Sequence, residues 1–553
     1  MSLVSANSKW ISQRFVAPRW LPLIAACGEA LVRHAVPIIY VAWFITTAAA
    51  QLWAWGVDPV LFPSPDEAVN RLAAQLVSKQ GNPFITLPFR DAEDLVHMRL
   101  WISVGNRALP VYPPVTYYFY GLLLRLGEVG LWLIASLPAA GIGAFAAGVA
   151  RLMSPKRRWL GLLAPALAFP ATYWIVRPWM NISPMLVAAC WALFFWANWR
   201  EKAKDGWLYA CFAAVAFAAA VRPDYAPYLL TASVLFSLAA APAAWRRIFA
   251  AGFAAGAFAL GLNLVLNKLT TGNAFRVAYQ LVSARETGQV SRSGPLHLFV
   301  ELLFPVGFPP WEVVWQLIRK YWIQLLPLPA LLLAQLAVVP LLFKQARLQM
   351  ALYAAAVCVV VCVMFARMNP EAFGSDDAVG RLSHTVPRYW TLVYLLAALP
   401  PLLLLGRWQW RSRLGAAAIG FGAAAACVLA VLGGLEIYSR QQTSLVYLER
   451  MRHDRARWLQ NAGRHIPKGA LVYTGTSDKL IWSRWSVGMI DDPVSTASSM
   501  RRAVDAGLPV YIAEPQYPRA KWRRALERAL REQELSVETE DRRSHVYRVD
   551  NSE

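Results

Sequence analysis

The sequence has few cysteines, and none is arranged as a metal or disulfide motif. Only 6 occur among 553 residues, nearly all of them within apolar runs. No Cys-X-X-Cys motif is present, and although Cys358 and Cys362 share a helix face, their apolar surroundings favour packing over chemistry. No cysteine lies beyond Leu435, so the polar C-terminal region needs no oxidative folding.

Other recognition features are missing as well. The chain has no glycine-rich phosphate-binding fingerprint, so no motif supports a nucleotide-binding fold. No internal repeat is visible, which gives little support to an inverted-repeat transporter. The apolar run 21–27 is too short for a signal peptide and Pro22 interrupts it, so we expect a basic interfacial helix before the first span.

Acidic residues are scarce relative to basic ones. The chain carries 33 Asp and Glu against 55 Lys and Arg, a formal net charge of +22. In a soluble protein this charge would suggest a nucleic-acid partner. Here 57% of residues are hydrophobic and the mean hydropathy is +0.37, and apolar runs long enough to cross a bilayer recur through the chain. We therefore expect a polytopic membrane protein whose basic loops meet anionic lipids, with no nucleic-acid partner.

The apolar runs predict about 11 transmembrane helices. These lie near 36–55, 129–150, 159–176, 181–199, 207–221, 225–241, 247–267, 324–343, 349–366, 389–406 and 414–435. Every second connecting loop is short and rich in Lys and Arg, which places those loops and the N-terminus in the cytoplasm. The other loops then face outward, including a first loop at 56–128 and a large loop at 268–323.

The composition divides the chain into two predicted domains. Residues 1–435 form a mainly α transmembrane domain, and residues 436–553 form a small C-terminal α/β domain on the periplasmic side. In the polar tail, helical patterns at 444–464, 496–506 and 519–532 alternate with strand-like segments. Those segments lie at 470–474, 508–513, 535–539 and 545–549.

The first outward loop carries the most informative polar stretch. Asp66 and Glu67 follow the first span at the start of a predicted helix, 66–80, and a second helix is predicted after Pro113-Pro114, at 116–126. A carboxylate pair at a helix N-terminus is also a common solvated arrangement, because the helix dipole favours it.

Arginines gather on the same predicted outward side. Such fixed guanidinium groups suit a phosphate, which they can bind in bidentate fashion, although each could equally extend its charge to the membrane interface. The candidates for phosphate binding are Arg177, Arg222, Arg276, Arg381 and Arg388.

This arrangement resembles the GT-C superfamily of membrane glycosyltransferases, which includes protein O-mannosyltransferases and the aminoarabinose transferase of lipid A. The matching pieces are Asp66-Glu67, the segment from Pro113 to Tyr118, Arg222-Pro223-Asp224-Tyr225, and Pro387-Arg388-Tyr389-Trp390. The resemblance rests on the order of these pieces along the chain and covers essentially all of residues 36–435. The chain departs from the pattern at Tyr112, where relatives often carry His.

The resemblance implies transfer of a sugar from a polyprenyl-phosphate donor to an acceptor hydroxyl, with inversion at the anomeric carbon. By this analogy Asp66 is the catalytic base and Glu67 orients or tunes it. No cofactor is required, and a divalent cation is left open, with Asp224 as a loose match to a metal-binding acid. The implied substrate contacts are Tyr112, Tyr117, Asp224, His384 and Tyr389.

Two interpretations from different classes follow. The first is the glycosyltransferase, with a lipid, glycan or protein acceptor, in a bacterial inner membrane. The second is a transporter of lipid-linked sugars or a non-catalytic cell-envelope assembly protein. A transporter should carry ionisable groups or broken helices at mid-bilayer, whereas spans such as 129–150 and 414–435 are almost free of charge.

Overall fold

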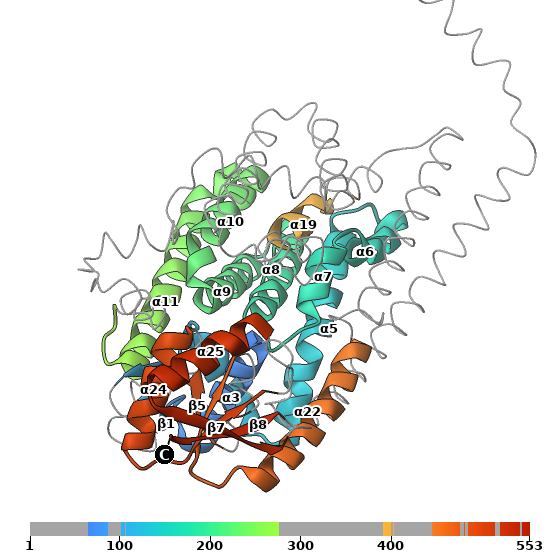
Figure 1. The fold of residues 1–553 in the computed structure, drawn as a ribbon. Helices are drawn as coiled ribbons and strands as arrows, with labels where there is room; N and C mark the ends of the chain where they lie inside the picture. Colours follow the sequence, from blue (N-terminus) through green and yellow to red (C-terminus); the bar gives the residue numbers. More distant parts are fainter. Residues whose placement is uncertain are drawn as a thin grey trace, which may run out of the picture.

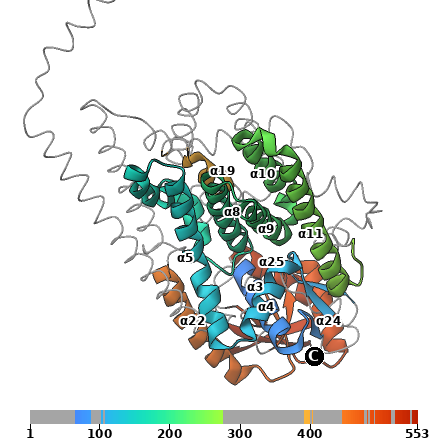
Figure 2. The ribbon, with the colours of Figure 1, turned by 180° about the vertical axis from the view of Figure 1, so that it is seen from behind.

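The computed structural model describes residues 65–86, 101–104, 107–275, 391–399, 402, 445–475, 481, 485–490, 492–514, 520–541 and 545–552. These residues form a helical region and a C-terminal sheet with its own helices (Figures 1 and 2). Five predicted site residues lie outside the described ranges, namely Arg276, Arg381, His384, Arg388 and Tyr389.

The helical region contains seven longer helices among the described residues. They are α3 (Pro65–Gln80), α4 (Pro114–Leu124), α5 (Glu128–Arg151), α8 (Ile182–Lys202), α9 (Asp205–Val221), α10 (Ala226–Ala240) and α11 (Trp245–Thr271). A small antiparallel sheet of order β1-β3-β2 joins α3 to α4 and consists of β1 (Ile85–Thr86), β2 (Trp101–Val104) and β3 (Arg107–Pro110). Short 3-10 turns η3 (Pro223–Tyr225) and η4 (Pro242–Ala244) separate α9, α10 and α11.

Several of these helices are long and apolar enough to cross a membrane. Within the described ranges, 3 segments qualify, Glu128–Arg151, Ile182–Lys202 and Pro242–Thr271, and each corresponds to a predicted span. The predicted spans 207–221 and 225–241 correspond to α9 and α10, which meet at Arg222 with a bend of 120°. The predicted spans at 36–55, 324–343, 349–366 and 414–435 lie outside the described ranges.

The predicted span at 159–176 does not form one continuous helix. The chain divides there into η2 (Pro155–Leu163), α6 (Ala164–Leu167) and α7 (Phe169–Ile175). Pro155 lies at the start of η2 and Pro170 at the start of α7, and Pro165 lies within α6. A proline inside a helix removes a backbone donor and clashes with the preceding turn, which explains why the apolar run breaks into short pieces.

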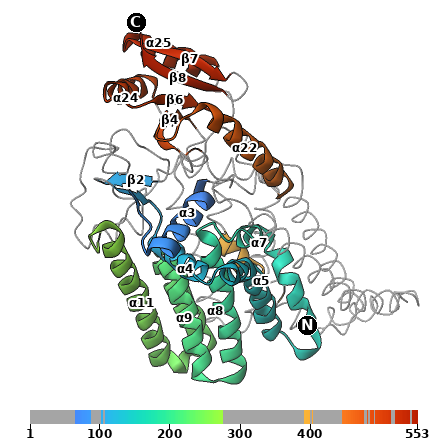
Figure 3. The same cartoon turned by 90° about the horizontal axis from the view of Figure 1, so that it is seen from below.

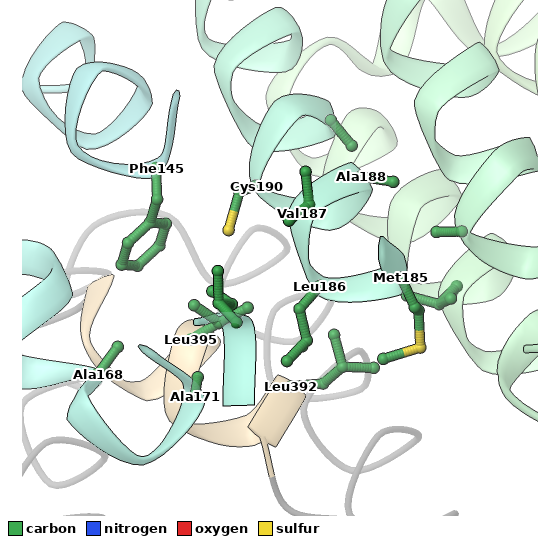
Figure 4. Packing of buried hydrophobic residues seen from close by; sticks show 14 of the residues in the cluster. Phe145, Ala168, Ala171, Met185, Leu186, Val187, Ala188, Cys190, Leu392 and Leu395 are labelled. Carbon is green, nitrogen blue, oxygen red and sulfur yellow. The ribbon is translucent and has the colours of Figure 1, made fainter. Parts of the chain in front are cut away.

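The main apolar core lies between α5, α7, α8 and α9. It also includes α19 (Thr391–Ala397), whose Leu392 and Leu395 are buried although they come from much later in the chain. Figure 4 shows these two leucines beside Leu186 and Ala171. Segments about 200 residues apart in sequence therefore share one core.

Helices α3 and α4 run parallel, with their N-termini at the same end. The Tyr112 hydroxyl bonds to Asp66, Gly121 lies against Ala74 and Val77, and Nη2 of Arg125 donates to the Val77 carbonyl at 3.4 Å. These contacts advance along both segments in the same direction. The two helix N-termini therefore lie together, beside the carboxylates of α3.

The close approach of these helices predicts a clear effect of Gly121→Ala. A Cβ there would lie 2.5 Å from Cγ1 of Val77 and 3.0 Å from the Ala74 carbonyl oxygen. We expect the substitution to lower the free energy of unfolding by about 1–3 kcal/mol, the usual cost of overpacking. Denaturant titration in detergent would measure it. Gly143→Ala in α5 is the control, because nothing lies within 4 Å of its Cβ and only the gain in helix propensity remains; equal stability in both variants would contradict the α3–α4 packing.

The C-terminal residues form a mixed sheet of order β5-β4-β6-β8-β7. Its strands are β4 (Leu471–Thr474), β5 (Ser486–Met489), β6 (Val510–Ala513), β7 (Leu535–Asp541) and β8 (Val546–Asn551), and its helices are α22 (Leu445–His465), α24 (Pro493–Asp505) and α25 (Ala520–Glu532). Strands β5, β4 and β6 are parallel, whereas β8 and β7 add antiparallel partners. Each predicted helix and strand of the tail has a counterpart, and β5 is an additional strand.

The C-terminal sheet and the first predicted outward loop share a buried cluster. Val69 and Val77 of α3 and Tyr120 of α4 belong to the same cluster as Leu471 and Val510 of the sheet. Figure 3 shows the sheet on the side of β2 and α3, with α8, α9 and α11 extending away on the other side. The first loop therefore lies between the long helices and the C-terminal sheet.

Candidate functional site

Asp66 and Glu67 occupy the first turn of α3. The helix begins at Pro65, whose fixed φ suits a first helical position, and the two acids complement the positive end of the helix dipole. Glu67 is 5% exposed, so it is not a solvated surface charge. A buried carboxylate requires a partner, and the two neighbours have different ones.

Asp66 accepts a hydrogen bond from Tyr112. The phenol hydroxyl donates to Oδ1 of the carboxylate, across 46 residues of sequence. Tyr112 directly precedes the Pro113-Pro114 step, where α4 begins, so the parallel packing of α3 and α4 brings the two side chains together. Tyr112 therefore orients the carboxylate predicted to be the base.

Removing the Tyr112 hydroxyl is expected to reduce activity without unfolding the protein. Tyr112→Phe keeps the ring but loses a hydrogen bond to a charged group, a contact worth about 1.5–3 kcal/mol. We expect a loss of about tenfold or more in kcat for the sugar transfer that the sequence resemblance implies, because each 1.4 kcal/mol is a factor of ten. Steady-state kinetics would measure it, and Tyr118→Phe, on the same helix pair, serves as a control. Wild-type kcat in Tyr112→Phe would remove this residue from the site.

Glu67 is held by Arg177 in a bidentate ion pair. Nε of Arg177 donates to Oε1 at 3.0 Å and Nη2 donates to Oε2 at 2.6 Å. The Arg177 and Glu67 side chains are 15% and 6% exposed, and the guanidinium carbon of Arg177 lies over the Trp174 ring, 5.4 Å from its centroid. Both carboxylate oxygens of Glu67 are thus engaged by one arginine, which separates its role from that of Asp66.

Arg222 forms a second bidentate pair, with Asp224. Nε and Nη2 of Arg222 donate to the two carboxylate oxygens at 3.0 and 2.7 Å, and Nη1 donates to Oδ1 of Asn181 at 3.0 Å. The bend between α9 and α10 makes this pair, since both residues belong to the Arg222-Pro223-Asp224 step. The guanidinium also lies over the Tyr225 ring, 5.2 Å from its centroid.

The segment between α7 and α8 carries contacts that the sequence did not reveal. Nδ2 of Asn70 donates to the Trp179 carbonyl at 2.9 Å, and the Tyr120 hydroxyl donates to the Pro178 carbonyl at 2.8 Å. Asn70, Tyr120 and Asn181 were not among the predicted site residues. A lone Asn or Tyr has no spacing that marks it in a sequence, so only the tertiary contacts identify them.

Tyr117, a predicted substrate contact, lies in the core. Its side chain is fully buried in the cluster that joins α3 and α4 to the C-terminal sheet. Burial raises the pKa of its phenol well above the ordinary value, so the hydroxyl stays neutral. In this structure Tyr117 contributes packing.

Metal-binding capacity is limited among the residues that the structure describes. No group of three or more His, Cys, Asp or Glu side chains lies together there. The loose match to a metal-binding acid, Asp224, has both oxygens bound by Arg222. The carboxylates of the described site are therefore arranged around arginines and a tyrosine.

Comparisons with known proteins find a likeness among solved structures. No protein-family model and no curated protein matches the chain. Among solved structures, the chain is similar to the crystal structure of ArnT from Cupriavidus metallidurans in the apo state, with a TM-score of 0.44 and 16% sequence identity. The alignment covers 93% of this chain and 98% of that one.

Proposed function

We propose that the protein is an inverting glycosyltransferase that moves a sugar from a polyprenyl-phosphate donor to an acceptor hydroxyl. The observation that carries the proposal is the pairing at the start of α3. Asp66 is oriented by a tyrosine hydroxyl, while its neighbour Glu67 is fully engaged by Arg177. One carboxylate is thus placed for proton transfer beside fixed positive charge, which a phosphate leaving group requires.

The two carboxylates receive different roles from their partners. Glu67 would have to break a buried bidentate ion pair before it could take a proton. Asp66 accepts a hydrogen bond from the neutral Tyr112 hydroxyl at Oδ1, and this contact stays in place when the other carboxylate oxygen takes a proton. Asp66 is therefore the base, and Glu67 fixes Arg177.

The proposed reaction needs a single displacement. The acceptor oxygen forms a bond to the anomeric carbon of the sugar, and the bond from that carbon to the phosphate oxygen breaks. The electron pair stays on the phosphate, and the acceptor proton moves to Asp66. A phosphate monoester is a weak base, so one carboxylate suffices, in contrast to the two acids of glycoside hydrolases. Attack from the opposite face inverts the anomeric centre.

Arginines would stabilise the departing phosphate. Arg177 and Arg222 each have a partner acid in this structure, so they would bind phosphate as part of an Arg–carboxylate unit. Arg276, Arg381 and Arg388 complete the proposed phosphate-binding set, and Tyr112, Asp224, His384 and Tyr389 the proposed sugar or acceptor contacts. A lipid, glycan or protein would serve as acceptor.

The proposed setting is the outer face of a bacterial inner membrane. The alternation of basic loops along the sequence supports this setting, because it places the first outward loop, 56–128, and the C-terminal region on the same, periplasmic side. The contact between that loop and the C-terminal sheet agrees with a common side. A lipid-anchored donor would then reach the site from the membrane surface.

A panel of donors tests the proposal. Purified protein in nanodiscs would be given polyprenyl-phosphate sugars that differ in the sugar, together with a total lipid extract as acceptor. We expect the protein to consume one donor and to form a glycoside whose anomeric configuration is inverted relative to that donor. Movement of intact donor across the bilayer of a proteoliposome, without any glycoside, would instead favour the transporter.

A further inference from the structure

The short segment 177–181 is attached to α3 and α4 at three consecutive residues. Arg177 pairs with Glu67, the Pro178 carbonyl accepts from Tyr120, and the Trp179 carbonyl accepts from Asn70. The Trp179 ring is fully buried and meets Tyr120 edge-on, with centroids 5.1 Å apart. The segment is therefore fixed by backbone and side-chain contacts, not by Arg177 alone.

The same segment reaches the second ion pair. Asn181 lies two residues after Trp179, and its Oδ1 accepts from Nη1 of Arg222, whose other donors hold Asp224. One segment thus contacts both Arg–carboxylate pairs. The contacts run from Glu67, the neighbour of Asp66, through 177–181 to Arg222.

We propose that Asn70 and Asn181 are positioning residues that fix the two arginines relative to each other and to Asp66. The inference rests on the proposed function, because it treats the arginines as ligands of the donor phosphate. Neither asparagine is assigned a contact with substrate. Their role is to keep two guanidinium groups at one separation, that of Arg177 before α8 and that of Arg222 after α9.

Burial at Asn70 supports this role. The side chain is 0% exposed, and its Oδ1 has no hydrogen-bond partner among the described residues. A buried acceptor without a partner is unfavourable, and an apolar residue would avoid that cost. The function of the amide at this position is therefore its NH₂ group, which holds the Trp179 carbonyl.

The two asparagines use opposite ends of the amide. A carbonyl only accepts, so Asn70 must donate, whereas a guanidinium only donates, so Asn181 must accept. Substitution by Asp removes the donor at residue 70 but keeps an acceptor at residue 181. The same substitution is thus predicted to break the contact at residue 70 and to keep it at residue 181.

Hydrogen-exchange mass spectrometry of the full chain in nanodiscs tests the inference without relying on activity. Asn70→Asp is expected to speed exchange in the peptide that contains 177–181, and Asn181→Asp is expected to keep the wild-type rate. Asn198→Asp is the matched control. Asn198 is also a buried asparagine that donates to a backbone carbonyl, that of Phe194 at 2.8 Å, but it lies near the other end of α8.

Kinetics supply the second readout. Asn70→Asp is expected to lower kcat by about tenfold or more with a smaller change in the KM for donor, since small misplacements of positioned groups are costly. Asn198→Asp should keep the wild-type kcat. Unchanged exchange at 177–181 in Asn70→Asp, or an equal loss of kcat in Asn198→Asp, would overturn the inference. If wild type consumes no donor, the proposed function fails, and the exchange data still decide whether the asparagines hold the segment.

Discussion

Asp66→Asn is expected to lower the rate of sugar transfer by about 10²–10⁴ while the protein remains folded. The amide oxygen of the asparagine can still accept a hydrogen bond from the Tyr112 hydroxyl, so this contact is kept. Only the ability to take a proton is lost. A positioned general base contributes about 10²–10⁴ in rate, and kcat should fall by that factor. The measurement is the initial rate of glycoside formation at saturating donor.

The control for Asp66→Asn is the stability and donor affinity of the variant. Its thermal transition in detergent should match that of wild type, and binding of unreacted donor should be retained. A variant that still transfers sugar at the wild-type rate would remove Asp66 as the base. Loss of both activity and folding would be uninformative about proton transfer, and Asp66→Glu then supplies the second variant, since it keeps a carboxylate.

Breaking the Glu67–Arg177 pair is expected to give the largest loss of stability. Removing one partner leaves the other as an uncompensated buried charge, which costs about 3–5 kcal/mol. Glu67→Gln and Arg177→Met should each show this loss in denaturant titrations. The double variant should recover part of it, because no lone charge remains. The two single variants and the double variant form a double-mutant cycle, whose coupling energy measures the interaction between Glu67 and Arg177.

The exposed pair between Arg247 and Asp205 is a matched control for this cycle. Its N–O distance is 2.8 Å, similar to that of the buried pair, but its side chains are 62% and 39% exposed. Surface pairs typically contribute about 0–1 kcal/mol. Equal coupling energies in the two cycles would contradict the burial assigned to Glu67 and Arg177.

The sequence predicts the local elements of this chain well. The helix expected at 66–80 is α3 (Pro65–Gln80), and the one expected at 116–126 is α4 (Pro114–Leu124). Apolar spacing, the prolines at the helix starts and the acidic first turn carry this information. The same local signals located the helices of the C-terminal region.

Tertiary relations were harder to predict. The apolar run at 159–176 looked like one span because hydropathy ignores its prolines, and β5 was missed because Ser486-Val487-Gly488-Met489 is a weak strand pattern. The ring of Tyr473 explains the glycine, since a Cβ at Gly488 would lie 2.4 Å from that ring. Neither feature follows from residue periodicity.

In the candidate site, likewise, the sequence predicts residues but not the contacts between them. Among the predicted site residues, Glu67 pairs with Arg177 and Asp224 pairs with Arg222, and 177–181 links the two ion pairs. Asp66 instead accepts a hydrogen bond from Tyr112. Which acid pairs with which arginine depends on the parallel packing of α3 and α4 and on the bend at Arg222. Those are long-range contacts, and no local pattern encodes them.

A doubly labelled donor tests the central claim most directly. The polyprenyl-phosphate sugar would carry ³²P in its phosphate and ³H in its sugar, and purified wild-type protein would be supplied with acceptor. We predict that wild type transfers ³H to the acceptor and leaves ³²P in polyprenyl monophosphate. With Asp66→Asn, both labels should stay in the intact donor. Transfer of both labels together, or movement of intact donor with both labels retained, would contradict it.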